Sequence, residues 1–83
     1  MIEIYTKSNC NFCNLAKELL ENYNVEYREF MLGQDFEREY IQDNFPLART
    51  YPIIVVDDVY VGGYQQLKET ITDINFGKSL LVE

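Results

Sequence analysis

The pattern of apolar and polar residues along the chain predicts alternating strands and helices. Residues 2–5 alternate as in a half-buried strand, and the polar cluster 6–9 that follows is typical of a helix start. In chain order we expect a strand at 2–5, a helix at 12–23, a strand at 25–30, a helix at 35–44, strands at 52–56 and 59–61, and a helix at 64–77. This order combines a parallel crossover with an antiparallel hairpin, so we expect an α/β sandwich of two or three layers.

Helical periodicity indicates which side of each helix faces the core, because apolar residues recur at steps of three and four. The expected core-facing residues are Phe12, Leu15, Ala16, Leu19 and Tyr23 in the first helix, Phe36, Tyr40 and Ile41 in the second, and Tyr64, Leu67, Ile71 and Ile74 in the third. Pro46 ends the second pattern, since proline removes a helical donor, and Gly77 ends the third.

The most apolar stretch, residues 52–56, predicts a strand in the middle of the sheet. Asp57 and Asp58 separate it from residues 59–61, as a tight hairpin requires. Gly62 and Gly63 then end the second arm. We therefore expect both arms of this hairpin to be central strands.

The chain of 83 residues and 9.8 kDa has room for a single domain, which we expect to span residues 1–83. No apolar run approaches the ~18 residues that a membrane-spanning helix needs, so we expect no contact with a membrane. The N-terminus lacks the basic start and the long apolar stretch of a secretory signal, which favours a cytoplasmic location.

Charge argues against nucleic acid as a partner, because 7 basic against 14 acidic residues give a net charge of −7. The acidic surface serves solubility or attracts basic patches on protein partners. The chain has no histidine, which removes the commonest general base and the commonest zinc ligand. Any chemistry therefore depends on cysteines, carboxylates or backbone groups.

Cys10 and Cys13 are the candidate catalytic residues, a C-x-x-C pair placed where a strand ends and a helix begins. Unpaired N–H groups and the positive end of the helix dipole stabilise an anion there, so Cys10 should have a lowered pKa and act as the nucleophile. Cys13 lies one turn further along the helix, about 5–6 Å away, and is the predicted resolving thiol. Lys7 adds a positive charge that favours the thiolate or an anionic ligand.

Three other interpretations of the cysteine pair stay open at this point. The two residues could be buried structural cysteines. A zinc site needs four ligands, so it would require a dimer or nearby carboxylates. An iron–sulfur cluster could bridge two chains with Cys10 as one donor. The redox pair is the leading interpretation, and we expect no resident metal.

Three segments together resemble a glutaredoxin of the small dithiol type: residues 6–13 with the C-x-x-C pair, 48–52 with Thr50-Tyr51-Pro52, and 62–64 with the paired glycines. The resemblance implies the thioredoxin fold, a four-stranded mixed sheet flanked by three helices. It also implies a monomeric oxidoreductase that uses glutathione to reduce protein disulfides or glutathione mixed disulfides. Pro52 should follow a cis peptide bond, which leaves the backbone N–H and C=O of Tyr51 free to pair with glutathione.

Glutathione carries two carboxylates and one ammonium, so its site needs anion-binding groups on both sides of the reactive sulfur. Lys7 and Arg49, with Arg38 as a further candidate, would hold the glycine carboxylate. Backbone N–H groups near Gln65 and Gln66, at the start of the last helix, would hold the γ-glutamyl carboxylate. The residues implied in glutathione binding are Lys7, Phe12, Arg49, Thr50, Tyr51, Pro52, Gly63, Tyr64, Gln65 and Gln66.

Two positions depart from the usual pattern of the family. Asn11 stands where relatives often have proline, which should alter the redox potential; in cluster-binding members a non-proline residue there goes with cofactor binding. Gln66 stands where relatives usually place Asp to meet the glutathione ammonium, so affinity should fall about tenfold. Two alternative functions follow: a redoxin that thioredoxin reductase reduces and that serves ribonucleotide reductase, and a carrier of a glutathione-ligated iron–sulfur cluster.

Overall fold

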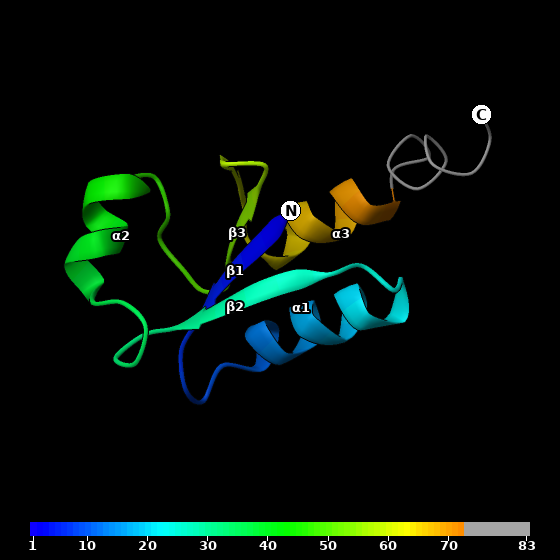
Figure 1. Cartoon of the computed structure of the whole chain (residues 1–83), viewed down its shortest axis with the longest axis horizontal. Helices are drawn as coiled ribbons and strands as arrows, with labels where there is room; N and C mark the ends of the chain where they lie inside the picture. The colour runs from blue at the N-terminus through cyan, green and yellow to red at the C-terminus, as the bar shows by residue number, and fades with distance from the viewer. Residues whose placement is uncertain (73–83) are drawn as a thin grey trace.

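The computed structural model describes residues 1–72 and contains a four-stranded mixed sheet with helices on both faces (Figure 1). In chain order the elements are β1 (Ile2–Thr6), α1 (Asn11–Asn22), β2 (Tyr27–Met31), α2 (Arg38–Asn44), β3 (Ile53–Val56), β4 (Val59–Gly62) and α3 (Tyr64–Thr72). This confirms the predicted fold class and the predicted order of elements. The last residues expected in the third helix, Ile74 and Gly77, lie outside the described residues.

The strands follow the order β2-β1-β3-β4 across the sheet. β1 pairs in parallel with β2 and antiparallel with β3, so that Ile4 lies opposite both Glu29 and Ile54. The β3–β4 hairpin turns at Asp57 and Asp58, which both have positive φ, at 50° and 68°. The expectation that both hairpin arms are central was wrong for β4, because no strand of residues 1–72 pairs with its outer side.

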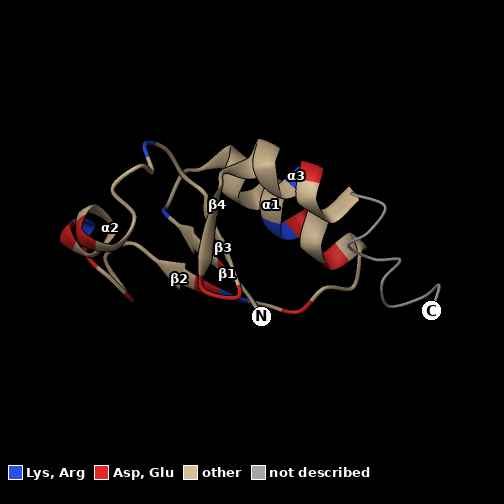
Figure 2. Cartoon of the chain, turned by 90° about the horizontal axis from the view of Figure 1, so that it is seen from above, with Lys and Arg blue, Asp and Glu red and all other residues tan. Residues whose placement is uncertain are grey.

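The sheet separates two hydrophobic cores, because successive side chains of a strand point to opposite faces. One core joins the sheet to α1 and α3 and contains Ile2, Ile4, Ala16, Leu20, Ile54, Leu67 and Ile71. The other lies on the α2 face and contains Tyr5, Phe36, Ile41, Ile53 and Val55. Figure 2 shows the result from above, with α2 at one end of the molecule and α1 and α3 together at the other.

The buried side of α1 agrees only in part with the predicted one, since Ala16 is 0% exposed as predicted and Leu19 packs against the same core as a partly buried residue. Cys13 and Leu20 are 1% and 0% exposed, whereas the predicted core residues Phe12 and Leu15 are 56% and 41% exposed. Tyr23, also predicted to be buried, is 49% exposed. The helix is turned so that its second cysteine faces the sheet, and this orientation follows from packing against β1 and α3 and not from helical periodicity.

Two elements, β2 and α2, begin later in the chain than predicted, because local hydrogen bonds close turns before them. Asn24, with φ of 56°, ends α1, and the N–H of Val25 donates to Leu20 O at 2.9 Å, so β2 begins later than predicted. The Asp35 carboxylate accepts the Met31 N–H at 2.8 Å, which closes a turn before α2. The second helix therefore begins at Arg38 and not at residue 35. Within residues 1–72, no helix has both the length and the apolar character needed to cross a membrane.

Candidate active site

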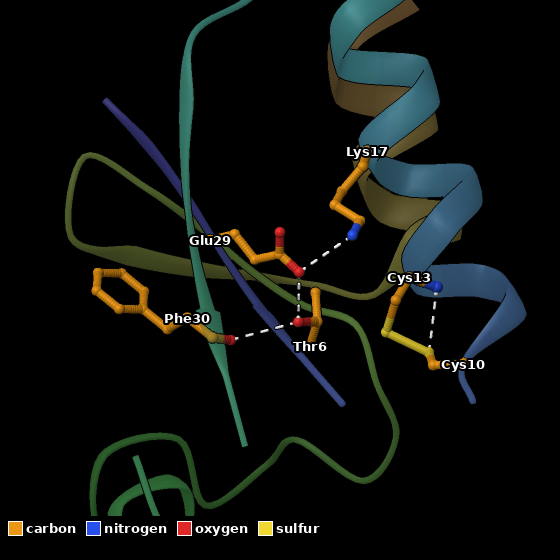
Figure 3. The surroundings of a disulfide bond; sticks show 6 residues. All are labelled: Thr6, Cys10, Cys13, Lys17, Glu29 and Phe30. Atoms are coloured by element: carbon orange, nitrogen blue, oxygen red, sulfur yellow. Dashed lines mark hydrogen bonds and ion pairs between the residues drawn. A yellow bond between two sulfur atoms is a disulfide. The ribbon is translucent and has the colours of Figure 1, made fainter. Parts of the chain in front are cut away.

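Cys10 and Cys13 form a disulfide at the N-terminus of α1, with their Cα atoms 5.2 Å apart (Figure 3). Asn9 directs the chain into the helix, since its φ of 56° lies in the left-handed region that asparagine tolerates. Cys10 is partly exposed and Cys13 is 1% exposed. An incoming disulfide or thiolate therefore meets Cys10 first.

The start of α1 supports a negative charge on Cys10. Cys10 is the N-cap residue, and its sulfur accepts a hydrogen bond from the Cys13 N–H at 3.1 Å. The first turn of α1 contains no acidic residue. A thiolate at this position gains both the hydrogen bond and the favourable end of the helix dipole, which is the arrangement that lowers a cysteine pKa.

A pocket of about 500 Å³ lies beside the entry to β3, and Lys7, Arg38 and Arg49 are among the residues that line it. These are three of the seven basic residues in a chain of net charge −7. The Lys7 ammonium lies 5.6 Å from the centre of the Tyr51 ring, a cation–π contact. Burial raises the pKa of the Tyr51 hydroxyl, and the Arg38 charge works in the opposite direction. The pocket is suited to an anionic ligand.

The peptide bond between Tyr51 and Pro52 is cis, as the sequence resemblance implied. Among the described residues, the backbone of Tyr51 takes part in none of the turn and loop hydrogen bonds. Gly63 lies against this segment, since a Cβ atom built on it would be 3.4 Å from Pro52 O. The turn between β4 and α3 therefore lies against the cis peptide bond.

A second hollow of about 420 Å³ continues from the first, because Arg49 and Thr50 line both. Gly63, Tyr64 and Gln66 line its other side. The Phe12 ring lies 5.7 Å from the Tyr64 ring, which connects α1 to this edge. Three of the glutathione contacts expected from the sequence, Phe12, Pro52 and Gln65, line neither hollow, and the Gln65 side chain instead donates to Glu69 Oε2 at 3.4 Å.

The model of the glutaredoxin family matches residues 2–61 of this chain. The chain belongs to the glutaredoxin family. Glutaredoxins are thiol–disulfide oxidoreductases, and the joined Cys10 and Cys13 are consistent with that chemistry in this one.

Similar glutaredoxins come from several bacteria. A probable glutaredoxin of Synechocystis is 41% identical over 63 residues, covering 75% of this chain and 72% of its own length. Glutaredoxin 3 of Escherichia coli K12 is 30% identical over 66 residues, covering 80% of each chain. Among solved structures, glutaredoxin 1 from Francisella tularensis complexed with cacodylate superposes with a TM-score of 0.72 at 29% identity, over 88% of this chain and 93% of that one. The Brucella melitensis glutaredoxin gives a TM-score of 0.68 at 30% identity, over 96% and 86%.

This glutaredoxin also has a polar group beside the disulfide that sequence reasoning missed. The Thr6 hydroxyl donates to Glu29 Oε2 at 2.8 Å, and the Lys17 ammonium donates to the same oxygen at 3.1 Å (Figure 3). One signal in the sequence could have indicated it. Glu29 stands in the middle of a strand, and the residues two positions before and after it, Tyr27 and Met31, are aromatic and apolar. Which residues it meets depends on the pairing of β1 with β2.

Proposed function

We propose that this glutaredoxin is a glutathione-dependent oxidoreductase that reduces protein disulfides and glutathione mixed disulfides. The observation that carries the proposal is the position of Cys10, partly exposed at a helix N-terminus. Three of the seven basic residues line one pocket, and one of them, Lys7, precedes Cys10 by three residues. Glutathione in general serves glutaredoxins as reductant. Its glycine carboxylate fits the charge of Lys7, Arg38 and Arg49, and its cysteine backbone fits the unpaired backbone of Tyr51.

The proposed cycle begins with attack of the Cys10 thiolate on the glutathione sulfur of a mixed disulfide. The Cys10–glutathione bond forms, the bond to the protein sulfur breaks, and the protein thiolate leaves with the electron pair and takes a proton from water. A second glutathione thiolate then attacks the glutathione sulfur, which releases oxidised glutathione and restores Cys10. With a protein disulfide as substrate, Cys10 attacks one substrate sulfur and releases the other as a thiolate. Cys13 then attacks the Cys10 sulfur, which releases the second substrate thiolate and leaves the Cys10–Cys13 disulfide. Two glutathione molecules reduce this disulfide and leave as oxidised glutathione.

Two cysteine variants test this division of roles in an assay with NADPH, glutathione and glutathione reductase. Cys10→Ser should abolish turnover of both substrate classes, because no nucleophile remains at the exposed position. Cys13→Ser should lose reduction of protein disulfides and retain turnover of a glutathione mixed disulfide, which needs no resolving thiol. Residual activity in Cys10→Ser, or equal loss of both activities in Cys13→Ser, would contradict the proposal.

A second candidate function, reduction by thioredoxin reductase in place of glutathione, is favoured by one observation. Gln66 offers no negative charge to the glutathione ammonium, and its side-chain oxygen already accepts the Gly63 N–H at 2.9 Å. Turnover of a protein disulfide such as that of ribonucleotide reductase with NADPH and thioredoxin reductase, in the absence of glutathione, would support this function. Failure in that assay, with robust glutathione-dependent turnover, removes it.

A further inference from the structure

The solvent-facing side of α1 carries a row of residues that begins at Cys10. Asn14 and Glu18 follow Cys10 at intervals of four residues, so each lies one turn further along the same side of the helix. The Asn14 N–H donates to Cys10 O at 3.2 Å, which closes the first of these turns. An open hollow of about 590 Å³ lies on this side, and we call it the α1 hollow; it is lined by Asn11, Asn14, Leu15, Lys17, Glu18 and Glu21. The α1 hollow therefore starts beside the nucleophile.

The α1 hollow has an apolar part at Leu15. The Leu15 side chain is 41% exposed and belongs to neither hydrophobic core. Phe12, three residues earlier, is 56% exposed, so two apolar side chains on adjacent turns face the solvent. Asn11 and Asn14 border Leu15 with side-chain amides, which both donate and accept hydrogen bonds. An apolar side chain between amides is suited to a peptide segment, which offers apolar side chains and backbone N–H and C=O groups together.

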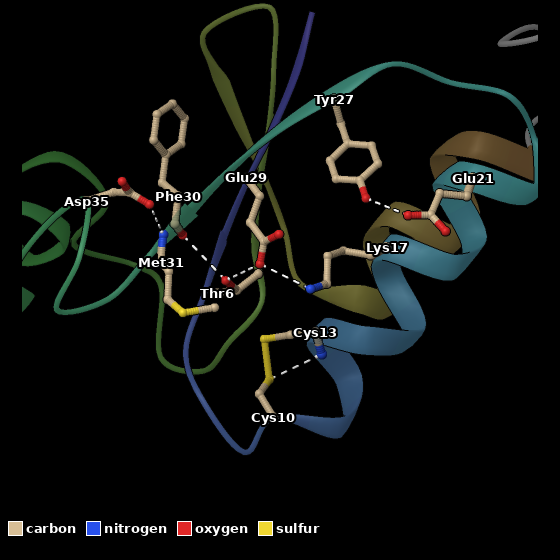
Figure 4. Close-up of polar contacts among 10 residues, drawn as sticks. All are labelled: Thr6, Cys10, Cys13, Lys17, Glu21, Tyr27, Glu29, Phe30, Met31 and Asp35. Carbon is tan, nitrogen blue, oxygen red and sulfur yellow. Dashed lines mark hydrogen bonds and ion pairs between the residues drawn. A yellow bond between two sulfur atoms is a disulfide. The ribbon is translucent and has the colours of Figure 1, made fainter.

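The charge presented by the α1 hollow is negative. Lys17 is the one cation among its lining residues, and the Lys17 ammonium donates to Glu29 Oε2 at 3.1 Å, turned toward β2 (Figure 4). Glu21 accepts the Tyr27 hydroxyl at 2.8 Å, and burial raises the pKa of Tyr27 to about 12, so this partner is neutral. Glu18 and Glu21 are both exposed. They present two carboxylates to a ligand in the hollow.

These features indicate which kind of molecule covers the α1 hollow. A protein disulfide that reacts with Cys10 must lie over the start of α1, because Cys10 is partly exposed there and Cys13 is buried. A second copy of this chain would bring a further net charge of −7 against Glu18 and Glu21. A substrate segment with one apolar and one basic side chain instead matches both parts of the hollow.

We propose that the α1 hollow binds the substrate segment next to the cysteine that Cys10 attacks, and that it selects an apolar residue followed by Lys or Arg. At a rise of about 1.5 Å per residue, Leu15 and Glu18 lie about 7 Å and 12 Å along the helix from Cys10. An extended segment advances about 3.3 Å per residue. Residues two and four positions from the substrate cysteine therefore reach Leu15 and Glu18. This selectivity rests on the protein-disulfide branch of the proposed function.

Single-turnover reduction of peptide disulfides by the reduced protein, without glutathione, tests the proposal. In this reaction Cys10 and Cys13 are oxidised to their disulfide, and the peptide disulfide is reduced to two thiols. The probe peptide has one disulfide within Cys-x-x-Cys, with Leu two positions and Arg four positions outside each cysteine, and its partner peptide has Ser and Gln there. The chain contains no tryptophan, so a tryptophan between the peptide cysteines reports reduction by its fluorescence, which a disulfide quenches.

The wild-type protein should reduce the Leu and Arg peptide about 10- to 50-fold faster than the Ser and Gln peptide. Leu15→Ser should remove the part due to Leu, about five- to tenfold, and keep the part due to Arg. Glu18→Gln should remove the part due to Arg, about two- to fivefold at low salt, and keep the part due to Leu. Peptides with only Leu or only Arg measure the two parts. Reduction of hydroxyethyl disulfide, which is too short to reach Leu15, should be unchanged in both variants.

Val59→Ser and Asp58→Asn are matched controls for the two variants. Val59 is 61% exposed, more than Leu15, and both control residues lie at the β3–β4 hairpin. Val59 pairs with Val56, which lies opposite Ile2 at the start of β1, whereas Cys10 follows the other end of that strand. Both controls should keep the full wild-type preference. If they lose it, the preference depends on overall surface polarity and the proposal is wrong.

Three further results would overturn the proposal. They are equal wild-type rates with the two peptides, an undiminished preference for Leu in Leu15→Ser, and a dimeric wild type that becomes monomeric in Leu15→Ser by sedimentation, which assigns this face to a second copy. Equal peptide rates alongside reduction of hydroxyethyl disulfide contradict the docking proposal alone. A reduced wild-type protein that reacts with neither peptide nor with hydroxyethyl disulfide contradicts the proposed function, and the docking proposal fails with it.

Discussion

At the residue scale, Gln66 caps the N-terminus of α3 at the edge of the candidate glutathione site. Its side-chain oxygen accepts the Gly63 N–H at 2.9 Å, the interaction by which a glutamine at the third helical position caps a helix N-terminus. The packing is tight, since a Cβ atom on Gly62 would lie 2.6 Å from Gln66 Cγ. Gln66 is therefore held in place, and it is uncharged.

We predict that Gln66→Glu lowers KM for a glutathione mixed disulfide about tenfold with little change in kcat. Glutamate has the same length as glutamine, so it keeps an acceptor for the Gly63 N–H and replaces a neutral contact to the glutathione ammonium by a charged one. Steady-state kinetics with glutathione reductase measures the effect. Gln65→Glu is the matched control, because its side chain points toward Glu69 and its KM should not fall. A similar decrease in both variants would indicate a general effect of charge and contradict the prediction.

At the scale of elements, the orientation of α1 links stability to redox chemistry. The helix presents Cys13, Ala16 and Leu20 to the core, so the side that anchors the helix also buries the resolving thiol. Leu15, one position before Ala16, points to solvent. The same rotation leaves Phe12 exposed beside Tyr64, at the edge of the candidate site.

This orientation predicts opposite consequences for two leucines of the same helix. Leu20→Ala should lower the free energy of unfolding by about 2–5 kcal/mol, because it leaves a cavity among fully buried neighbours. Leu15→Ala should change it by less than about 0.5 kcal/mol. Urea unfolding followed by circular dichroism gives both values. A larger loss in Leu15→Ala than in Leu20→Ala would mean that α1 packs on the side that helical periodicity predicted, and comparable losses would contradict the solvent-facing position of Leu15.

At the scale of the whole molecule, charge is unevenly distributed. Acidic residues appear on α2 at one end and on α1 and α3 at the other in Figure 2, whereas Lys7, Arg38 and Arg49 share one pocket. With a net charge of −7, the acidic side chains of the folded protein repel one another and also repel an anionic substrate, whereas the three cations of this pocket attract it. Salt should therefore act on stability and on substrate binding in opposite directions.

We predict that sodium chloride raises Tm and also raises KM for the glutathione mixed disulfide. Between about 0.01 M and 1 M salt the Debye length falls from about 30 Å to 3 Å, which screens both the self-repulsion and the attraction at the pocket. Thermal unfolding and steady-state turnover across this range measure the two effects. Lys7→Gln should show a weaker salt dependence of KM, since one cation of the pocket is gone. A Tm that decreases with salt would refute the account of self-repulsion.

The sequence by itself determined the features that depend on near neighbours. The order of strands and helices, the turn at Asp57 and Asp58, and the placement of Cys10 at a helix start all follow from patterns a few residues long. The family resemblance rested on short motifs of the same kind, and the family comparison confirmed it. These contacts are local, so the residues that make them are visible side by side in the chain.

Only the tertiary structure decided the features that depend on distant partners. The buried side of α1 is set by β1 and α3, and the edge position of β4 is set by the order in which the strands pair. Glu29 meets Thr6 because β2 pairs with β1 in one register, 23 residues apart in sequence. Helical or strand periodicity indicates which side of an element is apolar. Which other element covers that side is decided by the free energy gained when both apolar surfaces are buried together.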